Sequence, residues 1–248
     1  MNTKVNIAGV ELKNPVMTAS GTFGSGMEFS EFTDLNKLGA VVTKGVANVP
    51  WEGNPTPRVA ETYGGMLNAI GLQNPGIDLF VERDLPFLEK YDTKVVVNVC
   101  GRSEKDYVEV VERLADEKVD LLEINISCPN VKEGGIAFGQ NEKSVETITA
   151  AIKKVAKQPV IMKLSPNVTD ITVMAKAAEA GGADAISLIN TLTGMKIDIE
   201  RQRFALANKT GGMSGPAVKP VAVRMVYQAS NAVNIPVIGM GGISCAAF

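Results

Sequence analysis

Short apolar runs rich in β-branched residues alternate along the chain with segments of helical periodicity. The runs predict strands over residues 15–21, 40–45, 94–101, 120–127, 159–165, 185–191 and 236–243. Helices are expected over 28–38, 77–90, 104–117, 144–156, 171–180 and 218–232, and a small hairpin over 5–12 is a candidate barrel plug. Two long loops, 47–75 and 192–216, complete the pattern. Loops of that length inside a compact domain usually carry function.

Strands that alternate with helices predict parallel β–α units, and continuous apolar strands indicate a sheet covered on both faces. Polar residues fall near the carboxyl ends of six strands, which in a closed barrel converge on one mouth. They are Ser20, Lys44, Asn98, Asn125, Lys163 and Asn190. No Gly-x-Gly-x-x-Gly motif follows the first strand, so an open dinucleotide-binding sheet is disfavoured. We therefore predict an α/β fold, a TIM (β/α)8 barrel forming one domain over 1–248. With seven strands counted, we expect it to lack the last β–α unit.

Composition narrows the function classes. With 45% hydrophobic and 21% charged residues the chain is globular, and its net charge of −2 gives no basis for binding nucleic acid. The amino-terminal residues lack the apolar core of a signal peptide, and no apolar run is long enough to span a membrane. Three widely spaced cysteines, at 100, 128 and 245, suit a reduced cytoplasmic protein and offer no zinc-ligand spacing.

The chain contains no histidine. A Ser-His-Asp triad, a Cys-His pair and a histidine-ligated metal are therefore excluded. Any proton transfer must use Cys, Lys, Asp, Glu, Tyr or water.

The chemistry centres on residues 123–130, which read Glu-Ile-Asn-Ile-Ser-Cys-Pro-Asn. Pro129 ends the predicted strand because it has no N–H for the sheet. Cys128 is thus expected on the catalytic rim, and its thiol titrates near enough to neutral pH to accept a proton. The alternative is a buried cysteine that only packs.

Other rim residues suggest a flat, polar ligand. Lys44 and Lys163 stand at equivalent strand ends, which favours anion or cofactor contacts over solvent-facing lysines. Asn98, Asn125 and Asn190 are either turn residues or a ring of amides around a planar ligand. Glycines after late strands, at 211, 212, 215, 241 and 242, suit a phosphate site, and Ser20-Gly21 suits close approach of a ring. Together they indicate redox chemistry carried by a cofactor.

These residues resemble those of class 1 dihydroorotate dehydrogenases over the whole chain. The matching stretches are 54–62, 65–76, 125–131, 163–170, 189–191 and 211–220. The first two stretches, residues 133–139 and the lack of a membrane-binding extension resemble the NAD-linked 1B branch more than the 1A branch.

The resemblance implies FMN at the barrel mouth and oxidation of (S)-dihydroorotate to orotate in pyrimidine biosynthesis. Cys128 matches the base that takes the C5 proton while the C6 hydride passes to flavin N5. The implied FMN contacts are Ser20, Lys44, Gly45, Asn98, Asn125, Lys163, Ile189, Gly215, Gly241 and Gly242. The implied orotate contacts are Lys44, Asn68, Ala69, Ile70, Gly71, Leu72, Asn125, Asn190 and Thr191. A homodimer would join a partner subunit carrying FAD and an iron–sulfur cluster, as a heterotetramer that passes electrons to NAD+.

The family pattern continues past Gly242 with an eighth strand whose loop adds a Gly-Thr or Gly-Ser pair to the phosphate site. Residues 1–248 lack it, so we expect them to bind FMN weakly and to be unstable alone. Two alternatives remain open: a non-catalytic remnant that binds a partner or nothing, and a related flavin barrel acting on another dihydropyrimidine. The intact Asn-Ala-Ile-Gly-Leu-Gln-Asn loop at 68–74 disfavours the second.

Overall fold

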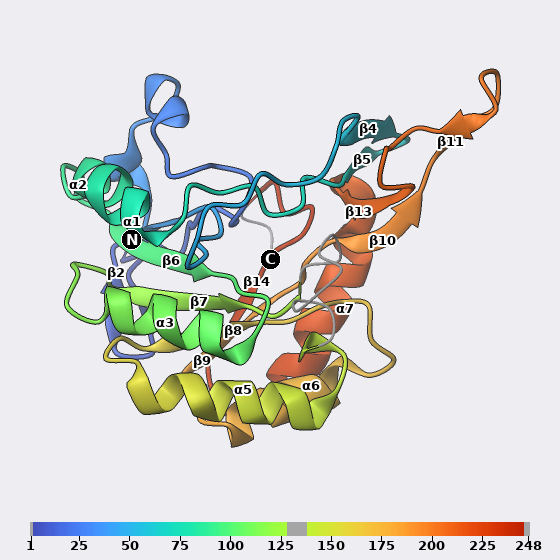
Figure 1. The fold of residues 1–248 in the computed structure, drawn as a ribbon. Coiled ribbons are helices and arrows are strands. Elements are labelled where there is room, and N and C mark those ends of the chain that lie inside the picture. The colour runs from blue at the N-terminus through green and yellow to red at the C-terminus, as the bar shows by residue number, and fades with distance from the viewer. Residues whose placement is uncertain (1, 128–137, 246–248) are drawn as a thin grey trace.

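The computed structural model describes residues 2–127 and 138–245, and its centre is a sheet of six parallel strands (Figure 1). The strands pair in chain order. They are β3 (Ala40–Val42), β6 (Lys94–Val99), β7 (Leu121–Asn125), β8 (Val160–Lys163), β9 (Ala185–Leu188) and β14 (Val237–Gly239). Met17 bridges Ala40 in parallel and adds a seventh segment at the β3 edge. Strands that pair in chain order belong to a barrel rather than a doubly wound sheet, so the predicted fold class is confirmed.

Helices lie on the outer face of this sheet and connect its strands, as the right-handed β–α–β rule requires (Figure 1). Two short helical segments, α1 (Ile77–Leu79) and α2 (Leu85–Leu88), lie between β3 and β6. One longer helix then precedes each of β7, β8, β9 and β14; these are α3 (Glu104–Leu114), α5 (Glu142–Val155), α6 (Ile171–Ala180) and α7 (Lys219–Ser230). Val95, Val97 and Val99 of β6 face these helices in the main apolar core. The intervening residues of each strand face the interior.

The amino-terminal hairpin fills the lower part of that interior, as predicted. Strands β1 (Val5–Ile7) and β2 (Val10–Leu12) pair antiparallel. Ile7 and Leu12 are buried in one cluster with inward side chains from five neighbouring strands, namely Ala40, Val42, Val96, Leu121, Ile161 and Ala185. The hairpin and five strands can share one apolar cluster because the sheet curves around the hairpin as a half-barrel.

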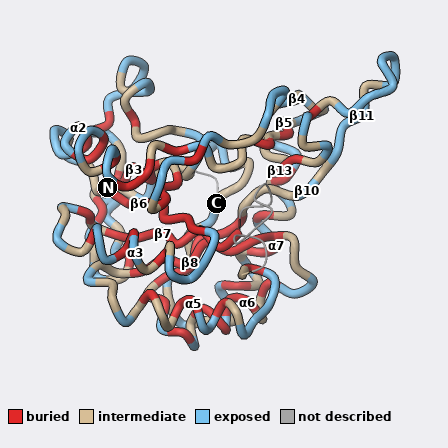
Figure 2. Tube along the Cα trace, viewed as in Figure 1, coloured by how far each residue is buried: buried red, intermediate tan, exposed pale blue. Residues whose placement is uncertain are grey.

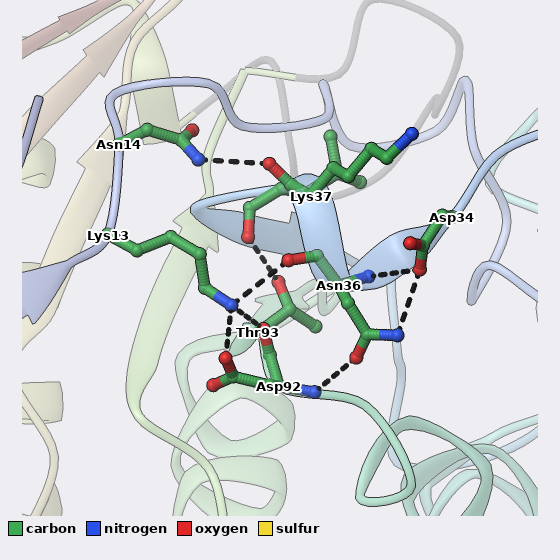
Figure 3. A network of polar contacts seen from close by, with 8 residues as sticks. Lys13, Asn14, Asp34, Asn36, Lys37, Asp92 and Thr93 are labelled. Atoms are coloured by element: carbon green, nitrogen blue, oxygen red, sulfur yellow. Dashed lines mark hydrogen bonds and ion pairs between the residues drawn. The ribbon is translucent and has the colours of Figure 1, made fainter.

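A polar network ties the end of the hairpin to the amino-terminal edge of the sheet (Figure 3). Lys13 Nζ donates to Asn36 O at 3.0 Å and pairs with Asp92 Oδ2 at 2.6 Å. Asp92 N–H donates to Asn36 Oδ1 at 2.7 Å, and Asn14 Nδ2 to Lys37 O at 2.9 Å. These contacts join residues 13–14, 36–37 and 92, which are far apart in the sequence, and fix the hairpin at the amino-terminal end of the barrel.

The predicted helix at 28–38 is wrong. The structure has two short 3-10 segments there, η1 (Glu28–Glu31) and η2 (Leu35–Lys37). The Asp34 side chain accepts from Asn36 N–H and starts a new turn, since Asp competes with the helix for backbone donors. The predicted helix at 77–90 is confirmed over 77–88, where α1, the π-helical turn η3 (Phe80–Asp84) and α2 follow one another without a break. Pro86 in the first turn of α2 has no N–H, so one helical hydrogen bond is missing beside the π turn.

The two predicted long loops are also wrong, because they form a second, antiparallel sheet. Its order is β10 (Leu192–Met195), β13 (Thr210–Ser214), β5 (Gly65–Asn68) and β4 (Val59–Thr62). Beyond it extends an arm, β11 (Ile197–Asp198) and β12 (Arg203–Phe204), which is largely exposed (Figure 2). The 3-10 turn η4 (Pro216–Val218) leads into α7. The first predicted strand, 15–21, is reduced to the bridge at Met17.

Within 2–127 and 138–245, no helix is long and apolar enough to cross a membrane. The same residues contain no group of three or more His, Cys, Asp or Glu side chains placed to hold a metal ion. That the chain is a single domain stays a prediction.

Replacing Ser103 with alanine is expected to destabilise the protein by about 1 kcal/mol. Ser103 caps α3 with a full capping box, in which Asp106 N–H donates to Ser103 Oγ and Asp106 Oδ2 accepts from Ser103 N–H. The melting temperature should fall by about 2–4 °C, and Ser103→Asp, which keeps a capping oxygen, should stay close to wild type. Equal melting of the alanine and aspartate variants would contradict a capping role.

Candidate active site

Five polar side chains form a buried layer directly above the apolar interior, at the carboxyl end of the barrel. Asn98, Glu123, Asn125, Lys163 and Ser187 are each at most 5% exposed. They face the interior of the barrel, because side chains two residues apart on a strand share one face. Each lies an even number of residues after an apolar residue of the interior cluster on the same strand: four residues for Asn125 and two for the others. Burying polar groups is unfavourable unless they are hydrogen-bonded, so this layer needs internal partners or a ligand.

Glu123 supplies the first partners. Asn98 Nδ2 donates to Glu123 Oε1 at 2.7 Å, and Ser187 Oγ donates to Glu123 Oε2 at 2.8 Å. Asn125 Nδ2 then donates to Asn98 Oδ1 at 3.3 Å. One carboxylate thus joins side chains from three strands.

The chain of hydrogen bonds continues to the sixth predicted strand end. Ser127 donates to Asn125 Oδ1 through its N–H at 3.3 Å and its hydroxyl at 3.0 Å. Asn190 Nδ2 donates to Ser127 Oγ at 2.8 Å, and Asn190 Oδ1 accepts from Thr191 N–H at 2.7 Å. These hydrogen bonds bring Asn98, Asn125 and Asn190 into one network; that they form a ring around a planar ligand stays a prediction.

The two predicted lysines lie at the same mouth. Lys163 pairs in register with Asn125 and is 4% exposed. Lys44 is half-buried just past β3, where its N–H donates to Gly24 O at 2.8 Å. A Cβ on Gly21 would lie 3.8 Å from Lys44 Nζ, so the loop that contains Ser20 runs beside this lysine.

The predicted substrate loop 68–72 also reaches this mouth. A Cβ on Gly45 would lie 3.1 Å from Asn98 Oδ1 and 3.3 Å from Leu72 Cδ2, which places the loop over the buried layer. Gly71 has φ +76° and packs on Asn54, where a side chain would not fit. The loop is fixed through Asn68, Ala69 and Ile70, by hydrogen bonds to Gly212 O, Arg58 O and Asn54 N–H.

Three predicted phosphate-site glycines from two loops converge next to the start of α7. Gly215 has φ +109° and precedes η4. A Cβ on Gly242 would lie 2.7 Å from Gly215 O, and one on Gly241 would lie 3.3 Å from Ile189 Cγ1. The glycines and Ile189 therefore lie together, as predicted, and bare backbone beside a helix start suits an anion.

A cavity of about 150 Å³ opens next to Lys44 and Gly45, between the loop at 24–28 and the π-turn. Buried Asp84 accepts from Ser25 Oγ at 2.8 Å and pairs with Arg83 Nε at 2.6 Å. The hydrogen bond to Asp84 raises the pKa of the Arg83 guanidinium, so the two side chains form an ion pair beside the cavity.

Sequence reasoning missed two residues of this site. Glu123 lies in the quoted motif, and its inward position follows from its two-residue spacing to Asn125. Asn167 donates to Thr191 O at 3.0 Å and accepts from Thr193 N–H at 3.0 Å. Asn167 lies in the stretch 163–170 that matches the family, which was its only signal in the sequence. The predicted base, Cys128, lies outside the described residues and directly follows Ser127 of the network.

The chain matches the family model described as dihydroorotate dehydrogenase over residues 2–247. The chain belongs to the dihydroorotate dehydrogenase family. It is 77% identical over 243 residues to the catalytic subunit of dihydroorotate dehydrogenase B (NAD(+)) from Lachnoclostridium phytofermentans, covering 98% of this chain and 81% of that one. Identity to the subunit of the same description from Alkaliphilus metalliredigens is 69%, over 98% of this chain and 80% of that one.

A solved dihydroorotate dehydrogenase supports the fold of this family member. The structure, from Eimeria tenella in complex with ferulenol, superimposes with a TM-score of 0.80 over 98% of this chain and 73% of that chain. At 24% identity the likeness concerns the fold alone. It agrees with the half-barrel formed by the central sheet.

Proposed function

We propose that this chain is the catalytic subunit of an NAD+-linked dihydroorotate dehydrogenase, which oxidises (S)-dihydroorotate to orotate in de novo pyrimidine biosynthesis. The observation that carries the proposal is the buried hydrogen-bond chain from Glu123 to Thr191, open to one mouth that also contains Lys44 and Lys163. Orotate has a carboxylate, two ring carbonyls and ring N–H groups on a flat ring. Lysines and amide side chains are the groups that recognise such a ring.

The residues present also suit FMN. The cradle of Gly215, Gly241 and Gly242, in which a Cβ would meet neighbouring atoms at 2.7–3.0 Å, leaves backbone accessible for a phosphate. Lys44, Lys163 and the amides of Asn98 and Asn125 would hold the ring system, with Ser20, Gly45 and Ile189 at its edges. When bound, the flavin supplies the hydride acceptor that no side chain can provide.

The chain's own residues would bind, orient and deprotonate the substrate. Cys128 is the proposed base for the C5 proton, since it directly follows the network residue Ser127 at the end of β7. Lys44, Asn125, Asn190, Thr191 and the loop residues Asn68, Ala69, Ile70, Gly71 and Leu72 are the proposed substrate contacts. The loop closes over the buried layer, so it would also exclude water.

The proposed partners follow from the relatives' description as catalytic subunits. We propose a homodimer of this chain that joins an electron-transfer subunit carrying FAD and an iron–sulfur cluster. The described residues hold no cysteine cluster for such a centre, so the partner would supply it. The cytoplasm is the proposed location, because isolated cysteines suit a reducing compartment.

The experiment that tests the function is anaerobic titration of the purified, FMN-loaded protein with dihydroorotate. The visible flavin absorbance is expected to bleach with one equivalent of substrate, and orotate is expected to shift the spectrum of the oxidised flavin. FMN-loaded protein whose flavin dihydroorotate does not reduce would contradict the proposal.

Replacing Gly215 with alanine is expected to weaken FMN binding by about tenfold or more. Its φ of +109° is unfavourable for alanine, and the new Cβ would lie 2.7 Å from Gly65 Cα, so the backbone of the proposed phosphate cradle must move. Quenching of FMN fluorescence by the apoprotein measures the dissociation constant.

Gly182→Ala is the matched control. Gly182 has a similar φ of +93° but follows α6 at the opposite end of the barrel, and its Cβ would meet only Lys153 Cγ at 3.7 Å. Equal losses of FMN affinity in both variants would show that Gly215 acts only through general stability.

A further inference from the structure

No ligand contact and no proton transfer is assigned to Glu123 above, yet it is the only carboxylate in the buried polar layer of Asn98, Glu123, Asn125, Lys163 and Ser187. It is 2% exposed, and both of its oxygens accept a hydrogen bond from a side chain on another strand. A carboxyl group in this position requires a reason, because an apolar side chain would fill the same space without desolvating a charge.

The reason lies in the direction of the hydrogen bonds. An Asn amide has a donating end and an accepting end, and either can face a neighbour. Beside Glu123 Oε1, Asn98 must present its N–H group, because its carbonyl oxygen would meet another oxygen. Asn98 Oδ1 then faces Asn125, which must present Nδ2 in turn.

The other end of the hydrogen-bond network, near Ser127 and Thr191, requires the same direction of donation. Ser127 N–H can only donate, and it donates to Asn125 Oδ1. Thr191 N–H likewise donates to Asn190 Oδ1, which turns Asn190 Nδ2 towards Ser127. Glu123 sets the same direction at the other end of the network, where its Oε1 accepts from Asn98 Nδ2.

We propose that Glu123 is a positioning residue that orients the amide groups of Asn98 and Asn125 towards flavin and substrate. In the fixed orientation each amide uses one N–H within the network and keeps a second N–H for a ligand. Carbonyl oxygens of a flat ring are the matching acceptors. This inference rests on the proposed function, because its ligands are FMN and orotate.

The test compares three variants by flavin spectra and melting. Glu123→Met fills the volume but accepts no hydrogen bond, and it is expected to raise the orotate dissociation constant about tenfold or more. Glu123→Gln can still accept from Asn98 while its amide faces Ser187, and it should stay within about threefold of wild type. Ser187→Ala, the matched control, removes the other bond to Glu123 and should also stay within about threefold.

The melting temperature separates orientation from packing. If Glu123 only fills space, Glu123→Met and Glu123→Gln should bind orotate equally well. Alternatively, a variant should lose orotate affinity only in proportion to the fall in its melting temperature. Either result overturns the inference. Wild-type protein whose spectrum does not respond to orotate would instead contradict the proposed function.

A second pair of variants keeps the test decisive if Glu123→Met does not fold. Asn98→Asp alone places two carboxyl groups against each other. Adding Glu123→Gln restores a donor facing an acceptor, and the carboxylate introduced at position 98 can still accept from Asn125 Nδ2. The double variant is therefore expected to bind orotate at least tenfold more tightly than Asn98→Asp, and absence of any recovery would overturn the inference.

Discussion

Replacing Cys128 with serine is expected to lower turnover by about 10²–10⁴-fold while FMN stays bound. A serine hydroxyl is a far weaker base than a thiolate, and general base catalysis contributes about that factor. The position supports the role, because the residue directly follows Ser127, which the network fixes at the end of β7.

Steady-state turnover of dihydroorotate, with the flavin content determined from the spectrum, measures the effect. Cys245→Ser is the control, since Cys245 is exposed and outside the polar layer. Turnover of the Cys128 variant within twofold of wild type would show that another group removes the C5 proton.

Replacing Lys163 with methionine is expected to weaken FMN binding by about one to two orders of magnitude, and more than it weakens orotate binding. Lys163 is 4% exposed and level with Asn125, so its charge acts in a site that excludes water. Hydrogen bonds to charged groups contribute more than those between neutral groups. Loss of the cation should also lower the flavin reduction potential, because reduction adds negative charge.

Spectroelectrochemistry and FMN titration provide the two measurements. Lys176→Met on the exposed side of α6 removes the same charge at a distance and is expected to change neither. If the Lys163 variant keeps the flavin reduction potential and the FMN affinity of wild type, this lysine has no role in flavin binding.

The order of the central sheet and the position of the site were predictable because both depend on short-range patterns. Continuous apolar runs followed by polar residues located β6, β7, β8 and β9 and their carboxyl ends to within a few residues. In a barrel all such ends face one mouth, so the sequence alone places Asn98, Asn125 and Lys163 in one group.

The predicted helix at 28–38 was wrong for a local reason. Asp34 starts a new turn inside it, because the Asp34 side chain accepts from Asn36 N–H. Such a side chain competes with helical hydrogen bonding, and periodicity alone does not weigh that competition.

The sequence by itself determined the parallel β–α architecture, the amino-terminal hairpin and the family, because each depends on residues close together in the chain. Only the tertiary structure decided that the predicted loops pair as one sheet, where Leu67 meets Met213. Only it showed that Glu123 is the shared acceptor of Asn98 and Ser187, which come from different strands. Pairing across such separations depends on sheet curvature and register, and these are set by packing of the whole barrel rather than by any local pattern.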